Sequence, residues 1–118
     1  MDPITGLSAG RIVVGSLSLL SPSLAARTLG LSATANPQLP VMTRMFGSRE
    51  IALGAITLAS SGAARRSLVQ VGVAVDGADA VTGVLGVASG SMPKVAGALL
   101  AVVALGAVAS GVVALQDS

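Results

Sequence analysis

The chain has 118 residues and a formal net charge of +2, with 53% hydrophobic and only 10% charged residues. Soluble domains typically carry about 25% charged residues, so a single domain of this length could not cover its surface with so few charges. We therefore expect an integral membrane protein whose partner is the lipid bilayer. The seven basic residues are too few to form a basic patch, which excludes nucleic acid as a partner.

Cysteine and histidine are both absent. Without them the chain has no disulfide framework, no thiolate or imidazole ligand for a metal ion and no Ser-His pair for nucleophilic catalysis. No G-x-x-x-x-G-K-[ST] stretch is present to bind nucleotide phosphates. We expect no catalytic residue, no metal site and no cofactor.

Four long apolar segments predict an all-α fold, an integral membrane four-helix bundle with short connections in one domain, residues 1–118. The expected helices cover about residues 4–20, 40–60, 67–88 and 93–115. At a rise of 1.5 Å per residue, helices of about 17–23 residues match a hydrocarbon layer about 30 Å thick. The short links force neighbouring helices to run antiparallel.

The ends and the first connection carry additional signals. Asp2 can cap the first helix, and Pro3 suits its first turn. The first connection is longer than the others, and its first half predicts a short interfacial helix over about residues 24–31. Its second half, residues 34–40, is rich in turn-forming residues.

We expect a multi-pass protein of the cell (inner) membrane. If the N-terminus lies in the cytoplasm, Arg65 and Arg66 lie inside, whereas Arg27 and Lys94 lie outside. The two counts are equal, so the N-terminal amine and the adjacent arginine pair decide in favour of an N-in, C-in orientation.

Six charged residues, three positive and three negative, lie inside the predicted spans. They are Arg11, Arg44, Arg49, Glu50, Asp76 and Asp79. A charge at the centre of a membrane helix costs about 2.5–3.5 kcal/mol on insertion scales, so a chain that keeps them must use them. All except Arg44, which lies about 9 Å further along its helix, are near the middle of their segments. We expect a buried charged network or a ligand pathway here.

Helix geometry predicts which charges meet. Asp76 and Asp79 are three residues apart and share one face of their helix. We expect Arg49 to pair with these aspartates and Arg11 to reach Glu50 or Asp76. Arg44 is expected to extend toward the nearer membrane interface, which a long side chain can reach.

Three functions are open for these charges. They can hold the helices together, because lipid gives helices no hydrophobic reason to associate. They can instead line a hydrated pathway for a proton, an ion or a small polar solute. Asp76 and Asp79 also form a D-x-x-D stretch, which can bind Mg²⁺ against a diphosphate, but enzymes of that kind normally carry a second acidic motif that this chain lacks.

Small residues predict close helix packing. Gly6 with Gly10, and Gly86 with Gly90, form small-x-x-x-small pairs. The last predicted helix has glycines and no charge in its interior. We expect it to face lipid, a second copy in a homo-oligomer or a partner membrane protein.

The stretches 44–54 (RMFGSREIALG) and 75–80 (VDGADA) resemble a family of uncharacterised four-helix membrane proteins common in actinobacteria, the DUF4267-like family. The opening stretch 6–15 (GLSAGRIVVG) is more distantly similar to the DoxX-like group of four-helix membrane proteins. The resemblance covers most of the chain and implies a four-helix membrane fold, but neither family implies a settled activity.

These observations favour a non-enzymatic accessory or scaffold subunit with a buried charged network. The alternative is a transporter of protons, ions or small polar solutes that uses the same charges. An enzyme is the least favoured of the three.

Overall fold

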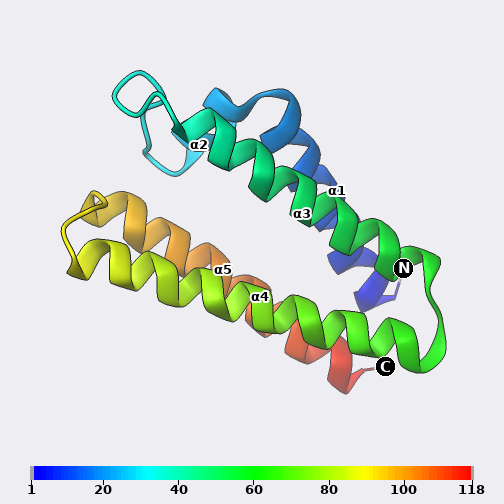
Figure 1. Ribbon diagram of the computed structural model, residues 1–118. Coiled ribbons are helices and arrows are strands. Elements are labelled where there is room, and N and C mark those ends of the chain that lie inside the picture. The colour runs from blue at the N-terminus through cyan, green and yellow to red at the C-terminus, as the bar shows by residue number, and fades with distance from the viewer. Residues whose placement is uncertain (1, 118) are drawn as a thin grey trace.

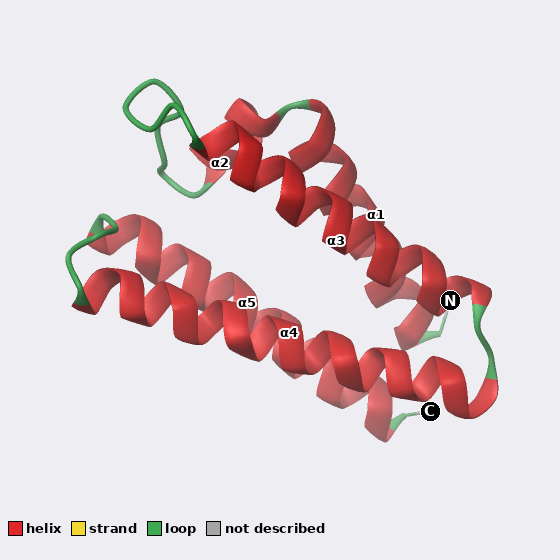
Figure 2. Ribbon diagram, viewed as in Figure 1, coloured by secondary structure: helices red, strands yellow, loops and turns green. Residues whose placement is uncertain are grey.

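The computed structural model describes residues 2–117, which form α-helices and no β-strand (Figure 2). The all-α fold class is therefore confirmed for this part of the chain. Within it, four helices are long and one is short. They are α1 Pro3–Leu20, α2 Pro22–Thr28, α3 Leu39–Ala59, α4 Gly62–Ala88 and α5 Lys94–Gln116.

The long helices form two antiparallel hairpins. α1 packs on α3 and α4 packs on α5, whereas far fewer residues of one hairpin touch the other. Figure 1 shows the hairpins close together where α1 begins and α5 ends, and diverging toward α2 and the α4–α5 turn. The molecule is elongated, with extents of 44 × 28 × 19 Å. The two hairpins are therefore close at one end of the molecule and diverge toward the other.

Local signals explain where α1 and α2 begin and end. The Asp2 carboxylate accepts a hydrogen bond from the N–H of Thr5 at 2.8 Å, which satisfies a free donor of the first turn of α1. α1 ends at Leu20, and Pro22 then opens α2, because proline fits a first helical turn but not a helix interior. Gly30 follows α2 with a φ of 76°, which glycine adopts without strain.

α1 and α3 touch backbone to backbone. A Cβ atom at Gly15 would lie 2.6 Å from the carbonyl oxygen of Gly47, and one at Gly54 would lie 2.6 Å from that of Ser8. Within each helix the two contact positions are about two turns apart and so lie on the same face. Small residues at these positions allow the close approach.

α4 and α5 pack in a similar way. A Cβ atom at Gly97 would clash with Val87, and one at Gly111 would clash with Val73. Ala104 lies midway between these two glycines and is buried. Glycine and alanine thus form the buried stripe of α5, and the larger side chains of that helix point elsewhere.

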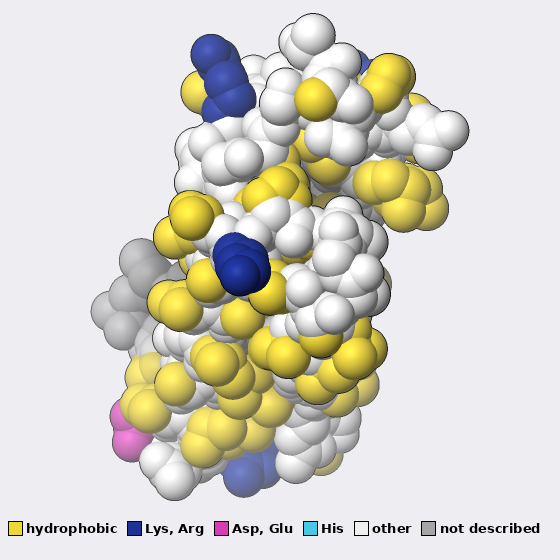
Figure 3. Space-filling model, turned by 90° about the vertical axis from the view of Figure 1, so that its left-hand side faces the viewer, with side chains coloured by type: hydrophobic (Ala, Val, Ile, Leu, Met, Phe, Trp, Pro, Cys, Tyr) yellow, Lys and Arg dark blue, Asp and Glu magenta, His cyan; other side chains and the backbone are white. Residues whose placement is uncertain are grey.

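Large hydrophobic side chains cover the outside of the molecule. More than half of the surface of each of Val13, Leu20, Met42, Val84 and Val95 is exposed. Figure 3 shows hydrophobic side chains gathered over the lower part of one face, with few charged ones among them. Such a surface is what a lipid environment favours and what water does not.

Three helices, α1, α4 and α5, are long and apolar enough to cross a membrane. α3 is of similar length, with 21 residues, but it carries Arg44, Arg49 and Glu50. α4 carries more charges, but Arg65 and Arg66 lie near its start, whereas the three charges of α3 fall within seven residues near its middle.

Two helix boundaries differ from expectation. α2 covers residues 22–28 instead of 24–31, because Pro22 begins it and the turn at Gly30 follows it. α4 begins at Gly62, before the expected start at residue 67. The expected start followed the apolar run, but alanine and arginine favour helix as strongly as leucine does, so Arg65 and Arg66 extend the helix.

The expected glycine pairs do not join helices. Gly6 and Gly10 are exposed, and a Cβ atom at Gly10 would meet nothing within 4 Å. Gly86 faces Met92 of the α4–α5 turn, and Gly90 adopts a φ of 74° in that turn. The spacing of the glycines therefore did not predict which face of α1 is packed. The packed face is the one that carries Ser8 and Gly15.

Candidate functional site

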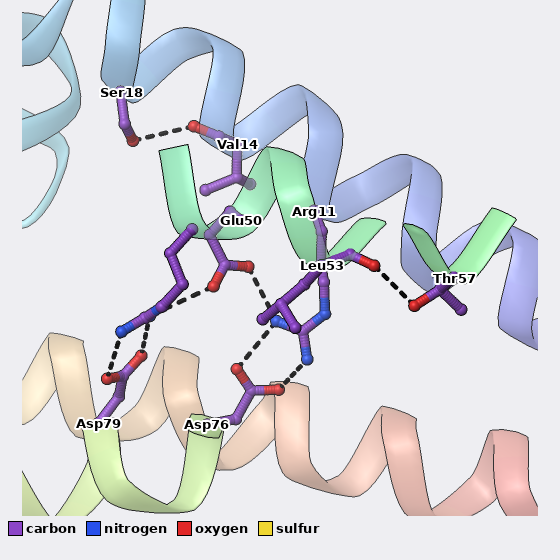
Figure 4. A network of polar contacts seen from close by, with 9 residues as sticks. Arg11, Val14, Ser18, Glu50, Leu53, Thr57, Asp76 and Asp79 are labelled. Atoms are coloured by element: carbon purple, nitrogen blue, oxygen red, sulfur yellow. Dashed lines mark hydrogen bonds and ion pairs between the residues drawn. The ribbon is translucent and has the colours of Figure 1, made fainter. Parts of the chain in front are cut away.

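Arg11 lies at the centre of a buried charged network between the two hairpins (Figure 4). Its Nη1 donates to Glu50 Oε2 at 2.8 Å and to Asp76 Oδ1 at 3.0 Å, and its Nη2 donates to Asp76 Oδ2 at 2.5 Å. The side chains of Arg11, Glu50 and Asp76 are only 9%, 6% and 5% exposed. One arginine of α1 therefore joins α3 to α4, and its contact with Asp76 is bidentate.

Arg49 forms the outer half of the same network. Its Nη1 donates to Asp79 Oδ1 at 3.2 Å, and its Nη2 donates to Asp79 Oδ2 at 2.6 Å and to Glu50 Oε1 at 3.2 Å. The side chains of Arg49 and Asp79 are 35% and 25% exposed. The Arg49 guanidinium also lies 4.9 Å from the centre of the Phe46 ring, at cation–π distance.

Helix packing explains why these residues meet. Arg11 belongs to the buried stripe of α1 that includes Ser8 and Gly15, and it therefore faces α3 close to Glu50. On α4, Asp76 lies one turn after Gly72 in the buried stripe. A Cβ atom at Gly72 would lie 2.7 Å from Arg11 Nη2, so the absence of a side chain there leaves room for the guanidinium.

The expected contacts are present, with one change in the charge count. Arg49 reaches Asp79, and Arg11 reaches both Glu50 and Asp76. Arg44 is exposed on α3 and does not take part. The balance of three positive against three negative charges therefore does not hold, because two guanidinium groups face three carboxylates. The network has a formal charge of −1 when all its groups are ionised.

A cleft of about 920 Å³ lies beside the network, between α1 and α5, with α2 residues at its wall. Its lining is mostly apolar, but Arg11 and the carboxylates of Glu50, Asp76 and Asp79 reach it. Ile4 of α1, Val69 of α4 and Ala114 of α5 pack together and hold the two hairpins in apolar contact. The cleft therefore combines apolar walls with one patch of excess negative charge.

The D-x-x-D stretch does not present free carboxylates. Asp76 accepts hydrogen bonds from Arg11, and Asp79 accepts them from Arg49. Among residues 2–117, no three acidic side chains gather in a group that could hold a metal ion. The arrangement is suited to pairing charges across the hairpins and to accepting one more positive charge at the cleft.

A second set of polar contacts joins the hairpins at the start of α1 and the start of α4. Arg65 Nη2 lies 3.2 Å from Asp2 Oδ1 and donates to Thr5 Oγ1 at 2.8 Å. The backbone N–H and the hydroxyl of Thr5 donate to the Asp2 carboxylate and lower its pKa. These groups lie nearer to solvent than the network, so a weaker effect on stability is expected.

Sequence reasoning did not predict three features of the site. Gly72 makes room for Arg11, Phe46 lies against Arg49, and a cleft opens beside the carboxylates. The contacts of Gly72 and Phe46 depend on the register between helices, and the cleft depends on the angle between the hairpins. The only available signals were a glycine one turn before Asp76 and the single aromatic residue of the chain, one turn before Arg49.

No protein-family model, curated protein or solved structure matches this chain. The resemblance to the DUF4267-like and DoxX-like families stays a prediction. The fold and the geometry of the network therefore carry the functional argument.

Proposed function

We propose that this chain is a multi-pass protein of the cell (inner) membrane that crosses the bilayer with α1, α3, α4 and α5. The apolar character of α1, α4 and α5 supports this topology. α3 is proposed as the fourth span because Glu50 is buried and Arg49 is paired, which supports a span in which two of its three charges are satisfied inside the protein. An even number of crossings brings both ends to one side, which we propose to be the cytoplasm.

We further propose that the protein is a non-enzymatic accessory or scaffold subunit whose charged network locks its two hairpins together. The observation that carries this proposal is that both arginine–aspartate pairs, Arg11–Asp76 and Arg49–Asp79, join the first hairpin to the second. Hydrophobic attraction between helices is absent in lipid, so these pairs supply the strongest directional contact between the hairpins.

The second candidate function is transport of a proton, an ion or a small polar solute. Two observations favour it: the network has a formal charge of −1, and Asp79 is partly exposed where the cleft reaches it. Ionisable groups in such a position commonly serve as relay or binding sites in membrane proteins.

The partner of the scaffold is proposed from the surface of α5. This helix exposes Val95, Val102, Val103 and Leu105 and has no charged residue between Lys94 and Asp117. A second copy of the chain or a partner membrane helix can pack on such a surface where the exposed small residues Ala98 and Gly106 allow close approach.

The test of the locking role compares Asp79→Asn with Asp117→Asn in mild detergent. Asp79→Asn removes the charge that pairs with Arg49, so we expect a lower melting temperature. Asp117→Asn makes the same chemical change at an exposed position at the end of α5 and is expected to leave melting unchanged. Equal melting of the two variants would rule out a locking role for Asp79.

The transport candidate is tested in liposomes. Flux of protons or of a small solute through the wild-type protein, lost in an Asp79→Asn variant that remains folded, would favour transport over locking. No flux of protons, common ions or small polar solutes through the wild-type protein would eliminate the transport candidate.

A further inference from the structure

We infer that the cleft between α1 and α5 binds a lipophilic organic cation, a molecule in which a positive charge is attached to an apolar body. The cleft volume of about 920 Å³ lies within the range of about 300–1,000 Å³ that is typical of small-molecule sites. Binding at this cleft is independent of whether the network locks the hairpins or carries a solute, so it extends the proposed function.

The walls of the cleft fit an apolar body. Most of the larger apolar side chains that line it come from α1 and α5: Leu7, Val14, Leu17, Leu100, Val103 and Val113. Gly6 and Gly10 lie on the same side of α1, and a side chain at Gly10 would project into open space. The glycines therefore leave space for a bulky ligand, and the valine and leucine side chains give the cleft an apolar wall.

The charge of the network fits a cation. Glu50, Asp76 and Asp79 all reach the cleft, whereas of the two arginines only Arg11 does. Arg11 is already bonded to two carboxylates, so the wall presents a formal excess of negative charge. A charge in apolar surroundings attracts an opposite charge much more strongly than in water. Asp79, at 25% exposure, is the carboxylate most open to such a partner.

The apolar walls discriminate among occupants. A small inorganic cation would lose its hydration water and find no three acidic ligands in return among residues 2–117. An anion would be repelled, and a neutral lipid chain would fill the cleft but leave the excess charge uncompensated. A cation whose charge is spread over an apolar body loses little hydration and can also contact the Phe46 ring in the cleft wall.

The first experiment compares two ions of nearly the same shape and opposite charge. Tetraphenylphosphonium and tetraphenylborate are titrated calorimetrically into the full chain in mild detergent. We expect one tetraphenylphosphonium per chain to bind at least about tenfold more tightly than tetraphenylborate. Equal affinity, tighter binding of the anion or no binding would overturn the inference, because charge would then not select the occupant.

Two glycine variants test the location of the site. Gly10→Leu fills the cleft, whereas Gly106→Leu adds the same side chain on α5 at a position that is also open and does not line the cleft. We expect Gly10→Leu to weaken tetraphenylphosphonium binding at least about tenfold and Gly106→Leu to bind as the wild type does. Equal binding by both variants would place the cation elsewhere and contradict the inference.

A charge variant tests the source of the selectivity. Asp79→Asn leaves two arginines facing two carboxylates, so we expect the preference for tetraphenylphosphonium over tetraphenylborate to fall toward unity. If a folded Asp79→Asn variant keeps the preference for tetraphenylphosphonium, the excess negative charge is not the source of the selectivity. A concentration-dependent dimer mass that Gly10→Leu abolishes would also overturn the inference, because a second copy would then occupy the cleft.

Discussion

Helices meet in two different ways in this molecule. Within the first hairpin, the backbones of α1 and α3 nearly touch at Gly15 and Gly47, and the contact depends on shape. Between the hairpins, the network built around Arg11 and Arg49 supplies a contact that depends on charge, beside the apolar contact of Ile4, Val69 and Ala114. A chain with almost no large buried side chains can thus organise its helices by removing side chains at one interface and by pairing charges at the other.

The two interfaces differ in how their energy is distributed. The glycine contact spreads many weak van der Waals interactions along two helices, so each position contributes a modest part. The charged contact concentrates the attraction in a few paired side chains, which are buried and largely shielded from water. Single substitutions should therefore have larger effects between the hairpins than within them.

The largest effect is expected for Arg11→Leu. This change leaves Glu50 without its closest partner and Asp76 without any arginine, and both carboxylates are buried. Removing one partner of a buried ion pair costs about 3–5 kcal/mol. Chemical unfolding in detergent should show a loss of this size, whereas Arg44→Leu, at an exposed position outside the network, should lose much less.

A combined variant isolates the reason for that loss. Adding Glu50→Gln and Asp76→Asn to Arg11→Leu removes the stranded charges, so much of the lost stability should return. If the triple variant is as unstable as Arg11→Leu alone, the loss comes from altered packing and not from unpaired charge.

A smaller effect is expected at the glycine contact. Gly15→Ala places a Cβ atom 2.6 Å from the carbonyl oxygen of Gly47, and relief of that overlap requires a shift of one helix. Overpacking of this kind costs about 1–3 kcal/mol. Gly10→Ala, on the open side of the same helix, should instead stabilise α1 by up to about 1 kcal/mol. Unfolding curves that shift in the same direction for both variants would contradict the backbone contact.

The smallest effect is expected for the exposed pair of Asp2 and Arg65, which joins the same two hairpins near solvent. The pKa of Asp2 is lower in the folded chain than its ordinary value, so its contribution is present above that value and is lost as pH falls through the folded-state pKa. The melting-temperature difference between wild type and Asp2→Asn should therefore shrink on acidification below about pH 4. A melting-temperature difference that grows on acidification would contradict this prediction.

The charged contacts could be predicted from sequence because depth along a membrane helix follows from residue number. Arg11, Glu50 and Asp76 fall near the middle of their segments, so their meeting required only that the segments pack side by side. The departure of Arg44 from the network was harder to anticipate. Its distance along α3 was known, but the charge count changed only because its side chain is exposed, which depends on how α3 is rotated.

The packing faces and the cleft could not be predicted in the same way. Gly6 and Gly10 match a common spacing for close packing, yet Ser8 and Gly15 make the contact. Each α1 face carries small residues, and the choice between them depends on the shape of α3. The cleft depends on the angle between the hairpins, which no local pattern of residues encodes.

We propose that the charged network fixes the separation of the two hairpins, and electron paramagnetic resonance distances test this most directly. The chain contains no cysteine, so spin labels can be attached at the exposed positions Ser48 on α3 and Thr82 on α4. A second pair at Thr82 and Val102 reports on the α4–α5 hairpin alone. The proteins are reconstituted in lipid bilayers with and without the Asp76→Asn and Asp79→Asn changes.

We expect one narrow distance distribution between α3 and α4 in the otherwise wild-type chain. In the doubly substituted chain it should become broad and extend to longer distances, while the α4–α5 distance stays the same. An unchanged α3–α4 distribution in the doubly substituted chain would contradict the claim, because the hairpins would then be held by something other than these charges.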